Sequence, residues 1–281
     1  MMMQKFKIQR RIVAGKTSES WETVPHAIFT TEARVDVLMR ILKEAPPEGV
    51  RITLNTAMLK VIATALGASP KMNAHLRYSR LFATGKLRIF DHIDASVPVL
   101  FADGSMMTVT LPSIESMSMR SIQDAFSDIR RRAGNTNLQE AMYDLALHDT
   151  LEGLKHFKII SSLGRLLGAA FGGVRLRTLS RSERKAYRRI PETERLTRRD
   201  LEPGTITITN VGSLYREWHG QCALLDILPP QVAAIALGAV RDSILPVTIA
   251  FDHRPLDAAD VMPFIRRLDE ILSDEELLRS L

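Results

Sequence analysis

The sequence has a single cysteine and no long apolar run, and both absences limit what the chain can be. A lone Cys222 excludes an internal disulfide and is typical of proteins of the reducing cytoplasm. Structural zinc sites need several closely spaced cysteines or histidines, and because the sequence has no such spacing we expect no metal. No apolar stretch reaches the roughly 20 residues that a membrane-spanning helix needs.

Composition and charge point to a globular protein with one strongly basic segment. Of the 281 residues, 45% are hydrophobic and 25% are charged, which is enough apolar material for one large domain or two small ones. Residues 155–199 contain thirteen lysines and arginines, more than the whole net charge of +6. That segment could meet an acidic partner, a phosphate-bearing cofactor or an anionic membrane surface, or it could be a solvated helix face. It has little aromatic interleaving and no nucleic-acid-binding motif, so we expect no nucleic-acid partner.

The pattern of apolar residues predicts helices and strands in mixed order. Residues 1–24 are a basic lead-in to the first strand. Alternating and continuous apolar runs predict strands at 27–35, 106–111, 204–211, 232–240 and 244–251, and two more within 86–101 broken near Asp94. Apolar residues at helical spacing predict helices at 35–43, 54–66 (capped by Asn55), 114–132 and 259–272. This order favours an α+β fold with a mixed sheet.

Residues 140–200 differ in character from the rest of the chain. Residues 151–171 are apolar with interspersed basic residues, and they predict a helical hairpin packed on the core, helices lining a substrate tunnel, or an interfacial amphipathic element. Residues 182–199 are a highly charged helix or linker.

One histidine stands where a general base could work. His253 follows the apolar strand 245–251 and is flanked by Asp252 and Arg254, with Asp257 four residues further on. A histidine at a strand end, beside charges that can orient its ring, is a plausible base at neutral pH. The alternative is a structural histidine satisfied by Asp252 or Asp257.

A strand of alternating threonines is the second candidate feature. Thr205, Thr207 and Thr209 alternate with apolar residues and therefore share one face, and Asn210 follows at the exit of the strand. A hydroxyl there could donate a hydrogen bond to an oxyanion. The alternative is an ordinary threonine ladder on an edge strand.

Taken in order, three segments resemble one known family. Residues 204–212 (GTITITNVG), 229–240 (PPQVAAIALGAV) and 251–257 (FDHRPLD) are similar to the catalytic domain of dihydrolipoamide acyltransferases. These are the core subunits of 2-oxo acid dehydrogenase complexes and share a fold with chloramphenicol acetyltransferase. The likeness includes residues 23–32, 68–74 and 93–99. It implies a chloramphenicol-acetyltransferase-like two-layer sandwich, with a mixed sheet flanked by helices, and a single domain (1–281) with an atypical basic and apolar insert at about 140–200.

The resemblance implies a role for each matching residue. His253 matches the base that takes the proton from a thiol, and Thr209 matches the hydroxyl that stabilises the tetrahedral oxyanion, with Asn210 beside it. Asp257 matches a supporting aspartate, and Arg10, with Arg11 as its neighbour, is the best-aligned candidate for the arginine that pairs with it. In the family these groups meet across a trimer interface, so we expect His253 and Thr209 to come from different chains.

The function implied is transfer of an acyl group between coenzyme A and a thiol of the dihydrolipoyl type or another small acceptor. We expect no covalently bound cofactor, acyl-CoA as substrate, and a cytoplasmic homotrimer or larger assembly of trimers. With no lipoyl domain in the sequence, the lipoyl group would have to arrive in trans on a separate carrier protein.

The sequence also departs from the family pattern. Ala258 stands where the family usually has glycine, and its methyl group could shift the turn or crowd the substrate channel. That departure leaves open a second function, a non-catalytic trimeric scaffold or acyl-CoA-binding assembly protein. A weaker third alternative has residues 150–175 binding a membrane or a lipid-like acyl chain.

Overall fold

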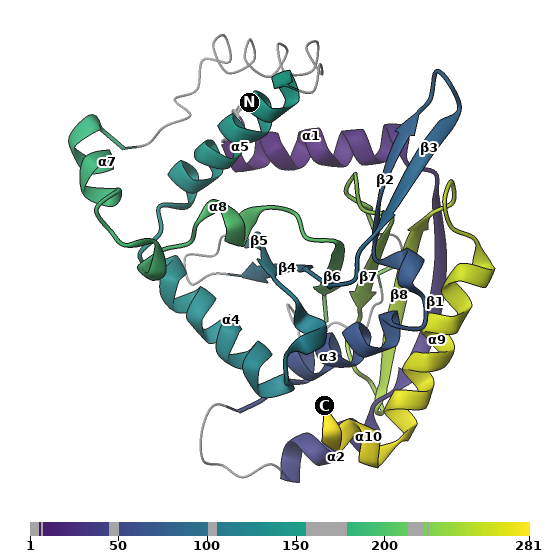
Figure 1. Cartoon of the computed structure of the whole chain (residues 1–281). Helices are drawn as coiled ribbons and strands as arrows, with labels where there is room; N and C mark the ends of the chain where they lie inside the picture. Colours follow the sequence, from purple (N-terminus) through teal and green to yellow (C-terminus); the bar gives the residue numbers. More distant parts are fainter. Residues whose placement is uncertain are drawn as a thin grey trace, which may run out of the picture. The chain divides into compact units, whose positions relative to one another are not determined.

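The structure, a computed structural model, describes residues 6, 8–44, 51–100, 106–155, 179–212, 222–223 and 225–281 (Figure 1). By its internal contacts the chain divides into two compact units. The smaller contains Met1–Ser18 and Asp128–Glu202, and the larger contains Glu19–Ser127 and Pro203–Leu281.

A six-stranded mixed sheet is the centre of the larger unit, in the order β1-β8-β7-β6-β4-β5. Its strands are β1 (His26–Arg34), β4 (Ala95–Leu100), β5 (Met106–Leu111), β6 (Ile206–Asn210), β7 (Ala233–Leu237) and β8 (Ile244–Asp252). Strand β6 is parallel to its neighbours β4 and β7, and the other neighbouring pairs are antiparallel. All of β7 and most of β8 are buried, which suits continuous apolar runs at the centre of a covered sheet. The predicted α+β fold with a mixed sheet is confirmed.

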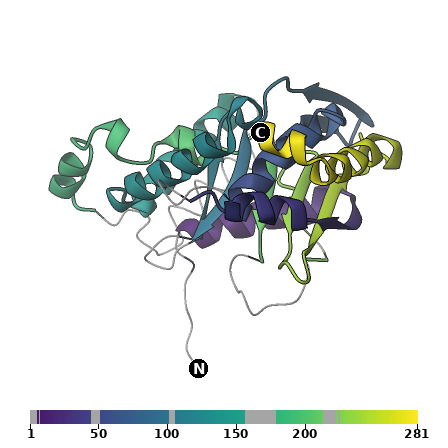
Figure 2. The ribbon, with the colours of Figure 1, turned by 90° about the horizontal axis from the view of Figure 1, so that it is seen from below.

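Helices α3 (Leu54–Leu66) and α9 (Ala258–Ser273) lie on one face of this sheet (Figures 1 and 2). They pack against each other, and α9 also contacts β1. The buried side chains of α9 recur at the spacing of one helix face: Val261, Phe264, Leu268 and Ile271. Helices α2 (Asp36–Glu44) and α10 (Glu275–Ser280) contact each other, and both also contact α9.

The start of α3 corrects one prediction. Thr53, and not Asn55, is the N-cap, because its hydroxyl accepts a hydrogen bond from the Thr56 amide at 3.2 Å. Asn55 lies within the first turn of the helix. The predicted bounds, 54–66, are confirmed.

A two-stranded hairpin of β2 (Ala74–Ser79) and β3 (Thr84–Ile89) belongs to the larger unit. The apolar pattern predicts β3, β4 and β5 but misses β2. The Asn73 side-chain amide closes the base of the hairpin by donating hydrogen bonds to the Phe90 carbonyl at 3.2 Å and the His92 carbonyl at 2.7 Å. The turn predicted at 102–105 lies outside the described residues.

The predicted helix 114–132 is divided. A 3-10 turn, η2 (Ile114–Ser116), precedes α4 (Met119–Gly134), and Ser113 before it has a left-handed backbone with φ of 50°. Residues 1–24, predicted as a lead-in, contain a helix, α1 (Ile8–Thr23). Its apolar residues do not line up on one face, so no helical pattern is visible in that part of the sequence.

The smaller unit is helical where it is described. It contains most of α1 and the last turns of α4, together with α5 (Leu138–Lys155), α7 (Arg181–Tyr187), η3 (Glu192–Glu194) and α8 (Arg198–Leu201). The charged segment 182–199 therefore contains three short helical pieces, with breaks at 188–191, where Pro191 lies, and at 195–197. Of the helical pair predicted for 151–171, residues 151–155 belong to α5, and the remainder lies outside the described residues.

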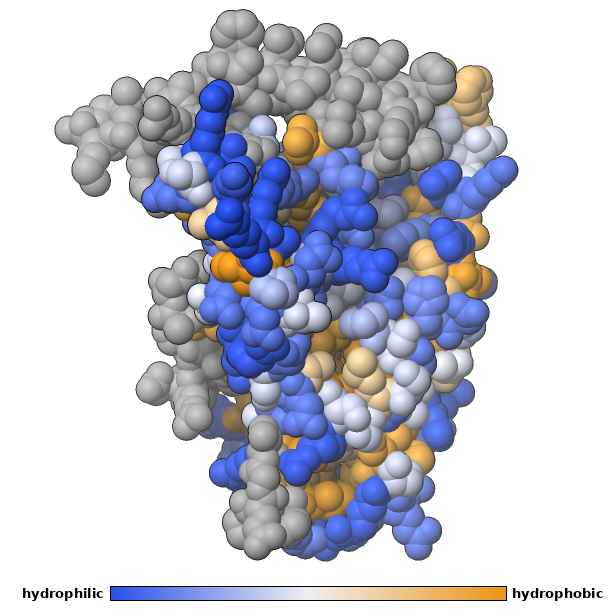
Figure 3. Space-filling view, turned by 60° about the vertical axis from the view of Figure 1, so that its left-hand side comes forward, coloured by the Kyte–Doolittle hydropathy of each residue, from blue (hydrophilic) through white to orange (hydrophobic). Residues whose placement is uncertain are grey.

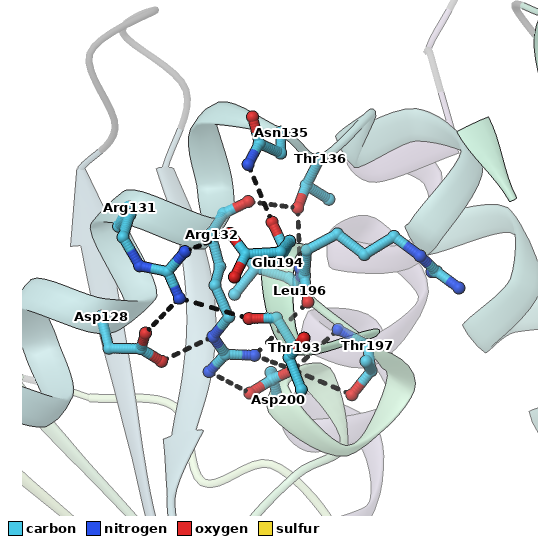
Figure 4. Close-up of polar contacts among 11 residues, drawn as sticks. Asp128, Arg131, Arg132, Asn135, Thr136, Thr193, Glu194, Leu196, Thr197 and Asp200 are labelled. Atoms are coloured by element: carbon cyan, nitrogen blue, oxygen red, sulfur yellow. Dashed lines mark hydrogen bonds and ion pairs between the residues drawn. The ribbon is translucent and has the colours of Figure 1, made fainter. Parts of the chain in front are cut away.

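A network of charged and polar side chains joins α4 to the segment that carries η3 and α8 (Figure 4). The Arg132 guanidinium donates to both carboxylate oxygens of Asp200, at 2.9 and 2.8 Å, and to Asp128 at 2.7 Å. Asp200 also accepts from the Thr197 amide and hydroxyl. The Leu196 amide donates to the Thr136 hydroxyl at 2.7 Å. Within the described residues, no helix combines the length and the apolar character that crossing a membrane would require.

Candidate functional site

His253 is the first residue after β8, at a sharply defined turn. The strand ends at Asp252, whose side chain is buried and accepts hydrogen bonds from the Arg254 guanidinium at 2.5 to 3.1 Å. The His253 amide donates to the Pro25 carbonyl at 3.0 Å, which fixes the turn to the residue before β1. The buried ion pair of Asp252 and Arg254 thus holds the backbone on which His253 stands, while the histidine itself is exposed.

The His253 ring is oriented by a backbone carbonyl. Its Nδ1 lies 2.9 Å from the Leu256 carbonyl oxygen. Because a carbonyl oxygen can only accept, the proton of the neutral ring belongs on Nδ1, and Nε2 then has the free lone pair. The ring also packs edge-on against Phe251, with centroids 5.8 Å apart. The sequence predicts that flanking charges orient this ring; within the described residues its hydrogen-bond partner is instead a carbonyl, and Asp252 is paired with Arg254.

Asp257 is the N-cap of α9. Its Oδ1 accepts hydrogen bonds from the amides of Ala259 at 2.8 Å and Asp260 at 3.3 Å, and the Asp260 side chain accepts from the Asp257 amide in return. This capping box fixes the point at which the turn after His253 becomes a helix. Ala258 is exposed as the first residue of α9 and has no positive φ, so its methyl group is accommodated in this turn.

The three threonines of β6 are used differently. Thr205 and Thr207 are buried, and their hydroxyls donate to Asn73 at 2.5 Å and to Gln231 at 2.7 Å. Thr209, nearer the end of the strand, is half-buried, and no hydrogen bond of its hydroxyl is found among the described residues. Of the three hydroxyls, only that of Thr209 lacks a hydrogen-bond partner among the described residues, and its role in the site stays a prediction.

The residues after Thr209 form a tight exit from the sheet. Asn210 is half-buried and pairs with Leu237 of β7. Gly212 passes so close to β7 that a β-carbon there would lie 2.1 Å from the Gly238 carbonyl oxygen. A side chain at position 212 would therefore force the strand exit to move.

The sheet register separates the two principal candidates. Thr209 pairs with Ala236, whereas Phe251 pairs with Ala233 on the same strand, β7. Because β7 and β8 are antiparallel, His253, two residues beyond Phe251, lies level with position 231, two residues before Ala233. Position 231 is five residues from Ala236, the partner of Thr209, and β8 and β6 are two strands apart in the sheet. At about 3.3 Å per residue and about 4.8 Å per strand, this is a distance of about 20 Å. One chain does not bring the His253 ring and the Thr209 hydroxyl to the same reacting group.

Arg10 is exposed on α1, in the smaller unit. Its pairing with Asp257 stays a prediction. The described part of the chain holds no group of three or more histidine, cysteine or acidic side chains that could bind a metal ion.

The family model and the curated relatives identify one family. The model of the 2-oxoacid dehydrogenases acyltransferase (catalytic domain) family matches residues 3–144 and 176–279. The acetyltransferase component of the pyruvate dehydrogenase complex of Zymomonas mobilis is 25% identical over 277 residues, which cover 93% of this chain and 47% of that protein. Its mitochondrial counterpart in Dictyostelium discoideum is 23% identical, with 89% and 31% covered. The chain thus spans about half, or less, of the length of these relatives.

Solved structures show the same fold. A probable dihydrolipoamide acetyltransferase from Listeria monocytogenes superposes with a TM-score of 0.64 at 17% identity, covering 99% of this chain and 95% of that one. The cubic core of a pyruvate dehydrogenase multienzyme complex gives a TM-score of 0.62 at 17% identity, covering 99% and 94%. Because the family model matches well over half of its residues, the chain belongs to the 2-oxoacid dehydrogenase acyltransferases, as the resemblance predicts, and contains their catalytic domain.

Proposed function

We propose that this chain transfers an acyl group between coenzyme A and a dihydrolipoyl-type thiol, with His253 as the base. The observation that carries this function is the hydrogen bond from Nδ1 of His253 to the Leu256 carbonyl, which leaves Nε2 as a basic nitrogen on an exposed ring. A base for thiol chemistry at neutral pH needs this combination of a fixed tautomer and an accessible lone pair.

The reaction then proceeds by addition and elimination. Nε2 takes the proton of the attacking thiol, and the thiolate forms a bond to the thioester carbonyl carbon. The negative charge moves to the carbonyl oxygen, where the Thr209 hydroxyl donates a hydrogen bond to it. As the tetrahedral intermediate collapses, the bond to the original sulfur breaks, and that sulfur recovers the proton from Nε2. No electrons are gained or lost, and no metal or bound cofactor is needed.

The separation of about 20 Å between His253 and Thr209 favours a site shared by two copies of the chain. We therefore propose a homotrimer, and assembly of trimers into a cage is consistent with the cubic core among the structures of the same fold. The lipoyl group would arrive on a separate carrier, and acyl-CoA would be a diffusible substrate. The lone Cys222 favours the reducing cytoplasm as the location.

Three supporting residues, Asp257, Arg10 and Asn210, would hold the reacting groups in place without taking part in the reaction. One solved relative, the dihydrolipoamide acetyltransferase of Azotobacter vinelandii, was studied for a serine, a histidine and an asparagine of its catalytic mechanism, the last two four positions apart. His253 and Asp257 have the same spacing, and asparagine and aspartate are both good helix N-caps. Both amide bonds to Asp257 go to Oδ1, so Arg10 of a neighbouring copy could bond to Oδ2. Asn210 supports the Thr209 turn.

The direct test is thioester exchange between acetyl-CoA and free dihydrolipoamide. We expect the wild-type protein to be active and His253→Ala to be slower by about a hundredfold to ten-thousandfold, the usual contribution of a positioned base. His92→Gln, which changes another partly exposed histidine, is the matched control and should keep full activity. Unchanged activity in His253→Ala would remove the proposed role of this residue.

A mixing experiment tests the shared site. His253→Ala and Thr209→Ala chains are co-expressed, so that mixed trimers contain interfaces with an intact His253 facing an intact Thr209. Random mixing should restore about one quarter of the wild-type activity, although each variant alone should be slower by about a hundredfold or more. No recovery in confirmed mixed trimers would contradict a site between subunits. Family membership does not favour the non-catalytic scaffold, and inactivity of the wild-type protein with several acyl-CoA substrates would revive it.

A further inference from the structure

Helix α7 in the smaller unit carries a cluster of cations that the proposed acyl transfer does not use. Arg181, Arg184, Lys185 and Arg188 line an open hollow with a volume of about 240 Å³. Their spacing of three, one and three residues places all four on one side of the helix. Figure 3 brings this side of the molecule forward and shows a group of strongly hydrophilic residues there. We refer to these four residues as the α7 cluster.

The anchoring of α7 leaves most of this charge uncompensated. Arg184 forms an ion pair with the buried Glu140 at 3.3 Å, which ties the helix to α5. Glu183 is occupied by the capping box with Ser180, so the amides at the start of the helix are already satisfied. In the described part of the chain, no carboxylate lies within 4.0 Å of the other three members of the cluster.

The positive charges of the α7 cluster repel one another. Arg181 with Lys185, and Arg184 with Arg188, are like charges four residues apart on a helix, an arrangement that destabilises an isolated helix. A bound anion would relieve this repulsion at all four positions. Cations distributed around the helix would solubilise the protein equally well, so their convergence on one hollow indicates a ligand.

The composition of the cluster specifies the ligand chemistry. Three of the four residues are arginines, whose planar guanidinium groups form paired hydrogen bonds with phosphate or carboxylate oxygens. Convergence from two helical turns favours a compact, multiply charged group over carboxylates spaced along a polypeptide. We propose that the α7 cluster binds a phosphate monoester or diphosphate group.

Pyrophosphate is the first probe, measured by isothermal titration calorimetry at low and at physiological salt. We expect binding that weakens as salt is raised, because the contacts are ionic. The variant Arg181→Gln/Lys185→Gln/Arg188→Gln should bind at least about tenfold more weakly, since one lost charge-assisted hydrogen bond is already worth about that factor. The control Arg34→Gln/Arg80→Gln/Lys86→Gln removes the same charge from exposed positions of the larger unit and should bind like the wild type.

Two further comparisons identify the source of the phosphate and the role of the arginines. The variant Arg181→Lys/Arg188→Lys keeps the charge but loses the paired hydrogen bonds, so it should be intermediate in affinity. Vesicles of phosphatidic acid in phosphatidylcholine test a lipid headgroup: cosedimentation that depends on the cluster assigns the site to lipid, and its absence together with pyrophosphate binding assigns it to a soluble ligand. Equal affinity of wild type and triple variant, or cluster-dependent binding of polyglutamate without pyrophosphate binding, would overturn the inference.

Discussion

Arg132 should hold the segment of η3 and α8 against α4, and replacing it with alanine tests this directly. Its guanidinium makes two parallel hydrogen bonds to Asp200 and a third to Asp128. The side chains of Arg132 and Asp200 are only 14% and 15% exposed. Burial raises the pKa of Asp200, but the hydrogen bonds from Arg132 and Thr197 outweigh it and bring the pKa below its ordinary value. The carboxylate is therefore charged at neutral pH and depends on its partners.

The loss of stability in Arg132→Ala depends on which hydrogen bonds Asp200 loses and which it keeps. A hydrogen bond to a charged group contributes about 1.5–3 kcal/mol, and Asp200 loses two. It keeps two bonds from Thr197, and water can reach part of the site, so the full cost of an unpaired buried charge does not apply. We expect a loss of about 2–4 kcal/mol in the local stability of the segment. Arg132→Lys keeps the charge without the paired geometry and should lose less.

Hydrogen–deuterium exchange measures this loss where it occurs. The amides of Thr197 and Glu202 are hydrogen-bonded within the segment, and the Leu196 amide bonds Thr136; all three should exchange at least about 30 times faster in Arg132→Ala. Amides of α3, in the larger unit, should be unchanged. Arg198→Ala, which removes an exposed ion pair with Glu202, is the matched control with a small effect. Exchange in Arg132→Ala no faster than in this control would refute the reasoning.

Three further predictions concern the larger unit. Thr207→Val should lower the free energy of unfolding by about 1–2 kcal/mol, because the buried hydroxyl bonds Gln231, whereas Thr209→Val should leave urea denaturation unchanged and lower kcat by about a hundredfold or more. Burial lowers the pKa of His75 in the folded protein below the ordinary value of about 6.5. The stability that His75 contributes should therefore be complete above a pH of about 6.5 and should decline as the pH falls toward the pKa of the folded state. The melting temperature of His75→Gln should lack this decline. Asp257→Ala should cost about 1 kcal/mol through the lost cap of α9, and Asp257→Asn should cost much less, again by urea denaturation.

The sequence predicts best those elements whose apolar pattern is continuous and local. Helix α3 and strand β8 are almost fully buried, so nearly every position in them is apolar or small, and their bounds are recognisable without the rest of the fold. Helix α9 has one buried face and a clear helical period. In each of these elements the buried positions are occupied mainly by apolar or small residues, so the sequence shows which positions are buried.

The elements that the sequence does not predict depend on distant partners. Strand β2 is mostly polar and half-exposed, and it is held by Asn73 at its base and by the bond from the Leu76 amide to the Pro230 carbonyl. The short helix η3 is held by Arg131 and α8 by Arg132, and both arginines are more than fifty residues earlier in the sequence. Such contacts leave no periodic pattern near the element that they stabilise.

The candidate site shows the same division between local and distant information. The spacing from His253 to Asp257 is recognisable in the sequence because the turn is local: Nδ1 bonds the Leu256 carbonyl, and the next residue caps α9. The four-residue spacing thus has a structural cause: the N-cap at Asp257 holds the Leu256 carbonyl in place, and that carbonyl orients the His253 ring. The distance between His253 and Thr209 depends instead on how β6 and β8 each pair with β7, and no spacing in the sequence reveals these registers. If Asp257 acts through this turn, Asp257→Asn should keep the thioester-exchange activity that Asp257→Ala loses, because asparagine can still cap α9.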